Sequence, residues 1–196
     1  ITNSDGTKFG KSEGNAIWLD AEMCSPYRFY QFWLNQADAD VIDRLKVFTF
    51  LTRAEIEEYE RLVAEEPFRR AAQKRLALEV TTLVHGSAAV DAAILASEAL
   101  FGQGDLAALD AATLEAALYE LPGASGTAGA SIAQLLVDAG LVQSLGEARR
   151  AIKQGGVYVN NAQVEAEDAV LEADQLLHGS FAVLRRGKKT LAAVRA

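Results

Sequence analysis

Apolar residues recur at intervals of three and four between residues 25 and 121, the spacing that gathers side chains on one face of a helix. Typical helix start and stop signals interrupt this spacing, and they include Ser25-Pro26, a capping box at Thr52 and Glu55, Pro67 and His85-Gly86. The pattern predicts about five or six helices, which begin near residues 25, 40, 52, 68, 87 and 105. We therefore expect residues 25–121 to form an all-helical domain.

Aromatic side chains crowd the first of these helices, at Tyr27, Phe29, Tyr30, Phe32 and Trp33. Their helical spacing favours packing against a neighbouring helix. A platform on which RNA bases stack is the sharper interpretation. Such platforms usually carry interleaved basic residues, however, and only Arg28 lies near these aromatic residues.

The pattern changes after Leu121. Residues 122–129 are rich in Pro, Gly, Ser and Thr and carry no charge, which predicts a flexible linker. Beyond it, capping boxes that begin at Ser131 and Ser144 predict two helices. Two hairpins follow, with turns at Asn160-Asn161 and Arg186-Gly187. We expect residues 130–196 to form a small α+β domain.

Charge is distributed unevenly along the chain. The net charge of −8 argues against nucleic acid as a partner. Residues 130–196, however, carry a net charge of +1, and their positive charges are clustered. Local patches, and not the net charge, decide where a phosphate backbone can dock.

Two basic clusters in residues 130–196 are candidates for RNA contact. Arg149, Arg150 and Lys153 lie within one or two turns of the second predicted helix, where they can meet phosphates or form a solvated face. The second cluster surrounds a predicted hairpin turn, where it can hold RNA or protect an edge strand; it comprises Arg185, Arg186, Lys188 and Lys189.

A third basic group lies in the helical region, at Arg69, Arg70, Lys74 and Arg75. It can pair with the acidic helix before it or contact an RNA backbone. The acidic residues of that preceding helix are Glu55, Glu57, Glu58 and Glu60.

The loop at the start of the chain has the composition of a phosphate clamp. Glycines at positions 6, 10 and 14 allow close backbone approach to a ligand, and Lys8 and Lys11 supply positive charge. Its spacing differs from that of a P-loop. The run Lys8-Phe9-Gly10-Lys11-Ser12 resembles the KMSKS signature of class I aminoacyl-tRNA synthetases. The longer run from Asp5 to Asp20 is similar to the bacterial tyrosyl-tRNA synthetase version of this signature.

The end of the chain carries a second resemblance. The run from Ser144 to Asn160, with its Arg149-Arg150 and Gly155-Gly156 pairs, is similar to the RNA-binding fold of ribosomal small-subunit protein four. Together the two resemblances imply a mainly α chain with a small α+β C-terminal domain. The implied order is the end of a class I Rossmann-type catalytic domain over 1–24, an all-helical anticodon-binding domain over 25–121, the linker, and the RNA-binding domain over 130–196.

The resemblance implies a tyrosine–tRNA ligase, in which tyrosine is activated by ATP, with Mg²⁺ accompanying the nucleotide, and then transferred to tRNA(Tyr). Lys8, Lys11 and Ser12 would be the catalytic residues, with Lys11 contacting ATP. Phe9 and Gly10 depart from the signature, and Gly10 lacks the hydroxyl found at that position in the family. A homodimer, formed through a catalytic domain that precedes these residues, is also implied.

Most of the active site of such an enzyme lies outside these 196 residues, so we expect the chain alone to be inactive. A start at Ile1, inside a loop motif, suggests a fragment of a longer protein. The competing hypothesis is a non-catalytic RNA-binding synthetase relative or fragment, for which loss of the loop lysines would be the distinguishing feature. A ribosome-associated or RNA-modifying enzyme with the same terminal domain would leave residues 1–24 unexplained.

Composition adds three expectations. One cysteine, Cys24, and two histidines make a protein-bound metal improbable. The chain contains no run of about 18 apolar residues, so we expect no membrane span. A single free thiol and the absence of a secretory leader favour the cytoplasm.

Overall fold

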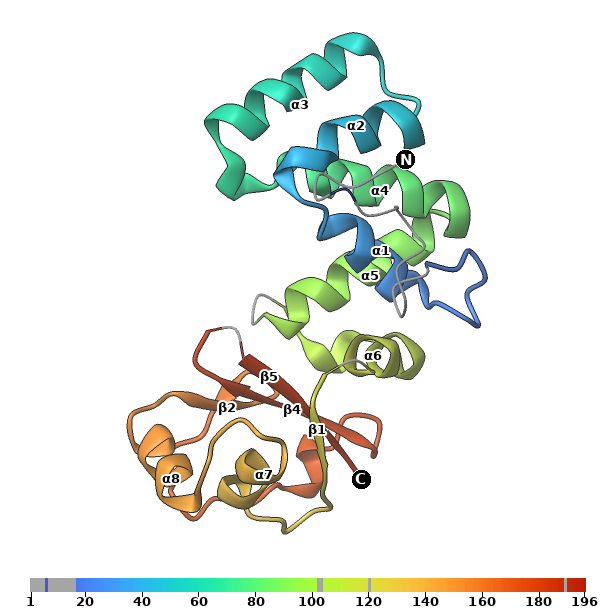
Figure 1. The fold of residues 1–196 in the computed structure, drawn as a ribbon. Helices are drawn as coiled ribbons and strands as arrows, with labels where there is room; N and C mark the ends of the chain where they lie inside the picture. Colours follow the sequence, from blue (N-terminus) through green and yellow to red (C-terminus); the bar gives the residue numbers. More distant parts are fainter. Residues whose placement is uncertain (1–5, 7–16, 102–103, 120, 189) are drawn as a thin grey trace. The chain divides into compact units, whose positions relative to one another are not determined.

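Helices form most of the computed structural model, which describes residues 6, 17–101, 104–119, 121–188 and 190–196 (Figure 1). A single five-stranded sheet lies in the C-terminal part of the described chain. Contacts divide the protein into two compact units, Ile1–Ala93 (unit 1) and Ile94–Ala196 (unit 2). The coarse prediction of a mainly helical chain with a small α+β C-terminal part is confirmed.

Unit 1 is helical throughout its regular structure, and its helices begin where the sequence places start signals. Ser25 is the N-cap of the first helix, and its hydroxyl accepts a hydrogen bond from the Arg28 amide at 3.2 Å. Thr52 and Glu55 form the predicted capping box. The elements are α1 (Pro26–Leu34), α2 (Asp38–Phe48), α3 (Arg53–Glu65), η1 (Pro67–Arg69), α4 (Ala71–His85) and the first part of α5 (Ser87–Leu100).

Aromatic side chains of α1 form the core of unit 1 with α4. Phe29, Tyr30 and Trp33 are exposed by 0%, 5% and 3%. The Phe29 ring meets His85 of α4 edge to face, with the ring centroids 4.9 Å apart. The core-packing interpretation of this aromatic segment is therefore confirmed for these three residues.

A left-handed residue delays the start of α4. The spacing predicts a helix over 68–84, but Arg70 adopts φ 50°, so α4 begins only at Ala71. The Arg70 side chain holds this turn, because its Nη2 donates to the carbonyl of Leu34 at 2.6 Å. A non-glycine residue in this conformation costs on the order of 1 kcal/mol, and the cost is offset by contacts that local periodicity does not reveal.

The sheet of unit 2 has the strand order β1-β5-β4-β2-β3. All neighbouring strands are antiparallel except β1 and β5, which are parallel. Asn160 and Asn161 connect β2 to β3 with φ 47° and 69°, as a tight hairpin turn of this composition requires. The strands are β1 (Gly123–Ser125), β2 (Val157–Val159), β3 (Ala162–Gln163), β4 (Phe181–Arg186) and β5 (Thr190–Arg195).

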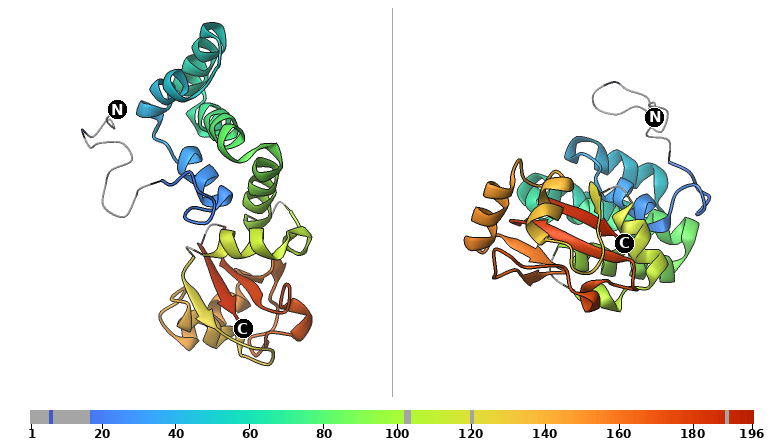
Figure 2. Two further views of the ribbon diagram at one scale, coloured as in Figure 1. Left: turned by 90° about the vertical axis from the view of Figure 1, so that its right-hand side faces the viewer. Right: turned by 90° about the horizontal axis from the view of Figure 1, so that it is seen from below.

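Both faces of this sheet are covered within unit 2. Alternate residues, such as Leu184 and Val194, point into a core shared with α7 (Ile132–Asp138) and α8 (Leu145–Lys153). Toward the opposite face lies α6 (Ala111–Leu118), as the views in Figures 1 and 2 agree. Three side-chain contacts to backbone carbonyls tie this second layer to the sheet domain: Arg195 to Leu118 at 2.8 Å, His178 to Leu109 at 2.8 Å and Asn161 to Ala99 at 2.7 Å.

The segment predicted as a flexible linker over 122–129 is instead part of the sheet. Gly123 pairs with Ala193 in the β1–β5 ladder, and the Gly126 amide donates to the Arg195 carbonyl at 3.0 Å. Small residues permit this close approach, because a Cβ on Gly123 would lie 2.9 Å from the Ala193 carbonyl oxygen. The small residues that suggested a flexible tether therefore allow two strands to pack closely.

The compact unit consequently begins at Ile94, inside α5, and not at residue 130. The shorter elements of the unit are η2 (Leu106–Ala108) and η3 (Ala173–Gln175). The capping box predicted at Ser131 is also wrong. Ser131 makes no side-chain cap bond, and Gln134 donates to Asp138 at 2.7 Å instead.

Candidate nucleic-acid interface

The candidate catalytic residues belong to the glycine- and lysine-rich loop near the start of the chain. Lys8, Lys11 and Ser12 lie outside the residues that the structure describes. Their roles stay predictions from the sequence. The geometry of a candidate site therefore comes from the basic clusters of unit 2.

Helix α8 carries the first of these clusters on a firmly anchored frame. The Ser144 hydroxyl accepts a hydrogen bond from the Glu147 amide at 3.3 Å and caps the helix. Ala148, Ala151 and Ile152 form the buried face, exposed by 0%, 8% and 2%. Gly155, with φ 70°, allows the chain to turn immediately after the helix.

The opposite face of α8 is cationic. Arg149, Arg150 and Lys153 are exposed, and none of them makes a hydrogen bond or ion pair with another described residue. Arg149 and Lys153 lie four apart, and like charges at that spacing destabilise a helix by a few tenths of a kcal/mol. Arg150 and Lys153 lie in the last turn of α8, where the helix dipole favours positive charge and offsets part of this repulsion. A bound polyanion would offset more of it, which makes this cationic face (Arg149, Arg150 and Lys153) the leading candidate for phosphate contact.

Arg186 belongs to the second predicted cluster, but it is engaged inside the protein. Its Nη1 donates to the Leu141 carbonyl at 2.7 Å, and its Nη2 donates to the Glu147 carboxylate at 2.8 Å. Glu147 also accepts the Gln143 amide at 2.8 Å. These two interactions, led by the Gln143 amide, lower the pKa of Glu147. Arg186 therefore holds α8 against β4 and offers little to RNA.

The remaining members of this cluster lie around the β4–β5 turn. Lys188 is exposed, and Lys189 falls among the residues that the structure leaves undescribed. The Gly187 amide donates to the Gly156 carbonyl at 2.8 Å, which brings the turn beside the loop that follows α8. The two clusters thus adjoin in the fold, although more than 30 residues separate them in the sequence.

Protection of an edge strand is not the purpose of this cluster. The strand order places β4 and β5 inside the sheet, with β1 and β3 at the edges. That interpretation of Arg185, Arg186, Lys188 and Lys189 is therefore wrong. Arg185 instead lies over the ring of Tyr158, with its guanidinium carbon 3.9 Å from the ring centroid. Sequence reasoning missed Tyr158, although the alternation Val157-Tyr158-Val159 indicates that the tyrosine faces away from the main core.

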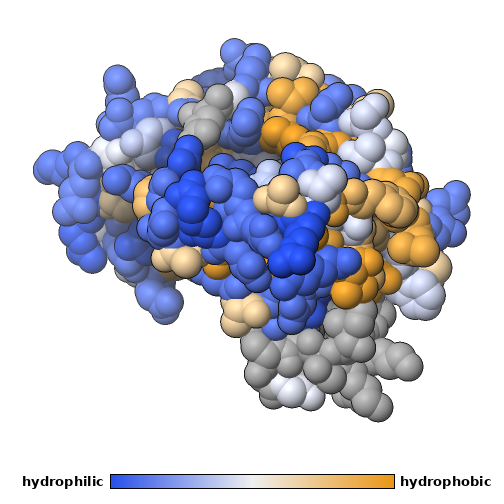
Figure 3. Space-filling model, turned by 90° about the horizontal axis from the view of Figure 1, so that it is seen from above, coloured by the Kyte–Doolittle hydropathy of each residue, from blue (hydrophilic) through white to orange (hydrophobic). Residues whose placement is uncertain are grey.

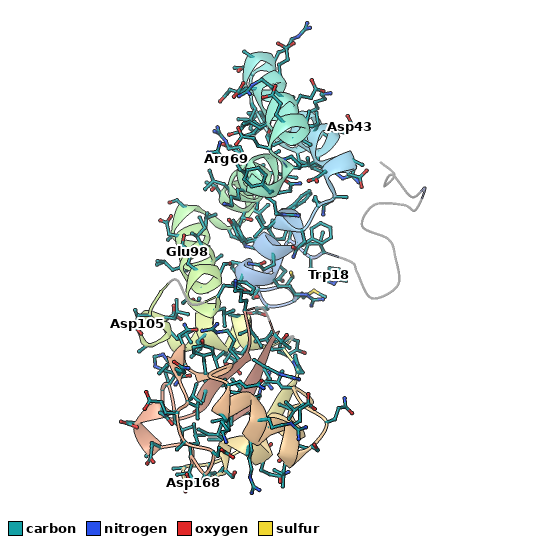
Figure 4. All side chains as sticks on the ribbon, turned by 90° about the vertical axis from the view of Figure 1, so that its left-hand side faces the viewer. Trp18, Asp43, Arg69, Glu98, Asp105 and Asp168 are labelled. Carbon is teal, nitrogen blue, oxygen red and sulfur yellow. The ribbon has the colours of Figure 1, made fainter. Side chains whose placement is uncertain are left out.

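The basic group in unit 1 does not form one surface. Arg69, labelled in Figure 4, pairs with Glu66 at 2.9 Å. Arg75 pairs with Glu79 at 2.7 Å and with Glu55 of α3 at 3.5 Å. The predicted pairing with the acidic helix is therefore confirmed for Arg75. Arg70 binds the Leu34 carbonyl, which leaves Lys74 as an isolated exposed cation among the described members of this group.

Unit 1 also has exposed aromatic residues, but no cluster of uncommitted cations surrounds those that the structure describes. Phe50 and Phe68 are exposed by 88% and 82%. Phe68 precedes Arg69 and Arg70, whose guanidinium groups are already engaged. Figure 3 shows one face of the protein, on which hydrophilic residues predominate around separate hydrophobic patches. Scattered apolar side chains of this kind are usual on protein surfaces.

Metal and membrane sites find no support in the described residues. They contain no group of three or more His, Cys, Asp and Glu side chains that could hold a metal ion. No helix in the same set is long and apolar enough to cross a membrane.

Comparison with known proteins gives two family matches. A family model described as tRNA synthetases class I (W and Y) matches residues 1–102. A second, described as Tyrosine--tRNA ligase SYY-like C-terminal domain, matches residues 113–194. The second match begins within α6, in agreement with the inclusion of that helix in unit 2.

Individual relatives agree with these matches. The tyrosine–tRNA ligase of Leifsonia xyli subsp. xyli is 67% identical over 195 residues, which are 99% of this chain and 44% of that protein. The ligase of Streptomyces coelicolor is 57% identical over 194 residues, with 99% and 46% covered. The chain thus spans less than half the length of these relatives.

Among solved structures, a C-terminally truncated mitochondrial tyrosyl-tRNA synthetase of Aspergillus nidulans is 40% identical. The match covers 46% of this chain and 25% of that one, with a TM-score of 0.43. A TM-score this low does not establish a shared arrangement.

Proposed function

The chain belongs to the class I tRNA synthetase family of the tryptophan and tyrosine enzymes, within its tyrosyl branch, and from this premise we propose that the protein containing these residues is a tyrosine–tRNA ligase. In the proposed reaction, the carboxylate of tyrosine attacks the α-phosphate of ATP and gives tyrosyl-adenylate and pyrophosphate. The tyrosyl group then passes to the terminal ribose of tRNA(Tyr). The 196 residues alone would not complete these steps, because they lack most of the active site.

The loop lysines are the proposed catalytic contribution of this chain. Lys8 and Lys11 would stabilise the negative charge that develops on the departing pyrophosphate, and Ser12 would complete the motif. Preorganised positive charge at such a position is the main source of rate in phosphoryl chemistry. Mg²⁺ would accompany ATP and share this charge. Gly10 supplies no hydroxyl to this loop.

The cationic face of α8 is the proposed contact with the tRNA backbone. The observation that supports it is that Arg149, Arg150 and Lys153 make no hydrogen bond or ion pair with another described residue, on a helix whose opposite face is buried. Contacts of this kind position a protein on RNA without reading its sequence. Lys188, beside the Gly156–Gly187 contact, would extend the same surface. Arg185 would also contact RNA, Lys189 stays a candidate from the sequence alone, and Arg186 would act only by holding α8 in place.

The remaining assignments follow the family resemblance. The helical part of the chain would bind the anticodon region, and the sheet-containing part would act as an RNA-binding domain of the ribosomal-protein-four type. A homodimer would form through the catalytic domain, and the reaction would take place in the cytoplasm.

Amino-acid-dependent exchange between ATP and pyrophosphate tests this proposal. The protein that contains these residues, at the full length of its relatives, is assayed across a panel of amino acids beside a Lys11→Ala variant. We expect exchange with tyrosine only, reduced tenfold or more in the variant, which corresponds to about 1.4 kcal/mol of transition-state stabilisation.

No exchange with any amino acid would reject the ligase and leave the non-catalytic RNA-binding relative as the better hypothesis. Exchange with another amino acid would reject the tyrosyl assignment. Unchanged exchange in the Lys11→Ala variant would reject the role of that lysine. The 196-residue chain alone serves as the negative control.

A further inference from the structure

Tyr158 and Arg185 occupy directly opposite positions on neighbouring strands β2 and β4. The residues that flank Tyr158, Val157 and Val159, point into the core shared with α7 and α8. Because side chains alternate along a strand, Tyr158 and Arg185 project from the other face of the sheet. They lie at the end of the sheet where β2 begins and β4 ends.

The geometry of this pair is that of a stacked platform. The guanidinium carbon of Arg185 lies 3.9 Å from the centroid of the Tyr158 ring. Arg185 Nη1 donates to the Gly187 carbonyl at 3.0 Å, which fixes the guanidinium from one side. Arg185 Nε is buried and has no hydrogen-bond partner among the described residues. The arginine is therefore held by the ring and the turn, and is not committed to an ion pair within the described chain.

The cover over this face of the sheet is less complete at the pair than at its neighbours. Val183 and Ala193 project from the same face and are exposed by 1% and 0%. Arg195, also on this face, is tied to the end of α6. Tyr158 and Arg185, by contrast, are only half-buried. A pair that served only to close the hydrophobic core would more simply be aliphatic.

The surroundings of the pair indicate a ligand with both phosphates and flat rings. The Gly187–Gly156 hydrogen bond places the pair beside the loop that follows α8, two residues beyond Lys153. Lys188 is exposed next to the same turn. Cations that meet phosphates therefore adjoin an aromatic ring covered by a planar guanidinium. Unpaired RNA bases stack on aromatic rings and on arginine planes, whereas duplex RNA keeps its bases in the stack.

We propose that Tyr158 and Arg185 form a stacking site for one unpaired nucleobase of the RNA whose backbone lies on the cationic face of α8. This inference rests on the proposed RNA contact of α8 and goes beyond it, since it adds a base-contacting site to a backbone-contacting one. The site would favour an RNA loop or bulge over a continuous duplex.

Salt dependence separates the two kinds of contact. The dissociation constant of the 196-residue chain for a tRNA(Tyr) transcript is measured over a range of salt concentrations. A phosphate contact contributes about 0.7 to 0.9 to the slope of log affinity against log salt, whereas a stacking contact contributes nothing. We expect Tyr158→Leu to weaken binding about tenfold at every salt concentration with an unchanged slope. Arg149→Gln should lower the slope by about one contact.

Two conservative variants protect the test against loss of folding. Tyr158→Phe keeps the ring and should bind like the wild type. Arg185→Lys keeps the charge but loses the planar guanidinium. It should weaken binding with little change in the salt slope. A fully paired RNA duplex of the same nucleotide number should bind Tyr158→Leu and wild type equally. Thermal unfolding of each variant by circular dichroism verifies that the sheet is intact.

Unchanged affinity in both Tyr158→Leu and Arg185→Lys, together with a reduced slope in Arg149→Gln, would overturn the stacking site and leave the α8 contact standing. Equal weakening on the duplex and the transcript would also overturn it. Absence of RNA binding by the wild-type chain would overturn the α8 contact and the stacking site together.

Discussion

Helices α3 and α8 are both amphipathic and both rich in charge, yet they differ in what their charges do. On α3, Arg53 pairs with Glu57 at 2.7 Å, and Arg61 bonds Glu58 and Glu65. On α8, Arg149, Arg150 and Lys153 make no hydrogen bond or ion pair with another described residue. The inner faces differ as well, because α3 has no fully buried residue and α8 has three.

This difference teaches how to tell a solvated face from a binding face. Charge density alone does not distinguish the two helices. The distinguishing feature is that the arginines of α3 pair with carboxylates of the same helix. The exposed face of α8 instead carries like charges that repel one another, although its inner face is tightly packed. A surface of the second kind is explained by a ligand that lies outside the chain.

The largest effect should come from breaking the frame of α8. Ile152→Ala removes a side chain exposed by only 2%, and should lower the free energy of unfolding by about 2–5 kcal/mol. Ile56→Ala, on the half-buried face of α3, should cost about 1 kcal/mol. Urea titrations followed by circular dichroism measure both variants. Both tryptophans, Trp18 and Trp33, lie in unit 1, so their fluorescence reports on that unit alone. Equal costs for the two variants would contradict the contrast in burial.

RNA affinity should respond next most strongly. The combined change of Arg149, Arg150 and Lys153 to Gln should weaken tRNA(Tyr) binding by at least about tenfold and lower the salt slope by about two to three. The matched control changes three cations of unit 1 to Gln, namely Arg53 and Arg61 of α3 and Arg69 of η1. Filter binding over a salt series gives both numbers. A loss as large in the control as in the α8 variant would show that total charge, and not the cationic face, governs binding.

Helix caps should have a smaller effect. Thr52 closes a complete capping box, with the Thr52 amide 2.8 Å from the Glu55 carboxylate, so Thr52→Ala should cost about 1 kcal/mol of unfolding free energy. Ser144→Ala should cost somewhat less, because the Glu147 carboxylate accepts from Gln143 in place of the cap residue. Ser131→Ala is the control, since Ser131 makes no cap bond. Thermal unfolding measures all three, and an equal loss for Ser131→Ala would refute the assignment.

Acid should weaken both helices through their first-turn carboxylates. Hydrogen bonds from Thr52 lower the pKa of Glu55, and the Gln143 amide, followed by Arg186, lowers the pKa of Glu147. A lowered folded-state pKa contributes stability that is complete above the ordinary value of 4.5 and is lost as the pH falls through the lowered value. Melting temperatures should therefore decline below pH 4.5, less steeply in Glu55→Gln and Glu147→Gln than in the wild type. Parallel curves for all three proteins would contradict this origin.

Single surface charges should give the smallest effects and opposite signs. Arg53→Gln breaks an exposed ion pair and should cost less than about 0.5 kcal/mol. Arg149→Gln relieves the repulsion from Lys153 and should raise stability by a few tenths of a kcal/mol. Precise thermal unfolding at low salt compares them. A destabilised Arg149→Gln variant would indicate a partner for Arg149 within the protein.

Local signals made most of the helices predictable from the sequence. The caps at Ser25, Thr52 and Ser144 and the turn at Asn160-Asn161 act over two to four residues, and each is found where the sequence indicates it. The cationic face of α8 was predictable for the same reason, because helical spacing alone places its three cations together.

Contacts between distant residues were not predictable in this way. Arg186 reaches Glu147 and Leu141 across 39 and 45 positions, so its commitment inside the protein leaves no local trace. The Gly123–Ser125 strand has the composition of a tether and pairs with residues about 70 positions later. Tyr158 becomes a candidate stacking residue only because Arg185 lies opposite it in the sheet.

The position of β5 has a consequence for synthesis on the ribosome. This strand lies between β1 and β4, although it is the last of the five to be translated. Strand β1, whose partner is β5, and the β5-facing edge of β4 therefore stay unpaired until residues 190–195 leave the ribosome. A nascent chain that stalls before this point leaves β1 without a partner and one edge of β4 unpaired, and such edges can pair with other chains. The β4–β2–β3 part of the sheet can pair before β5 is made, and β5 then completes the sheet by joining β1 to it.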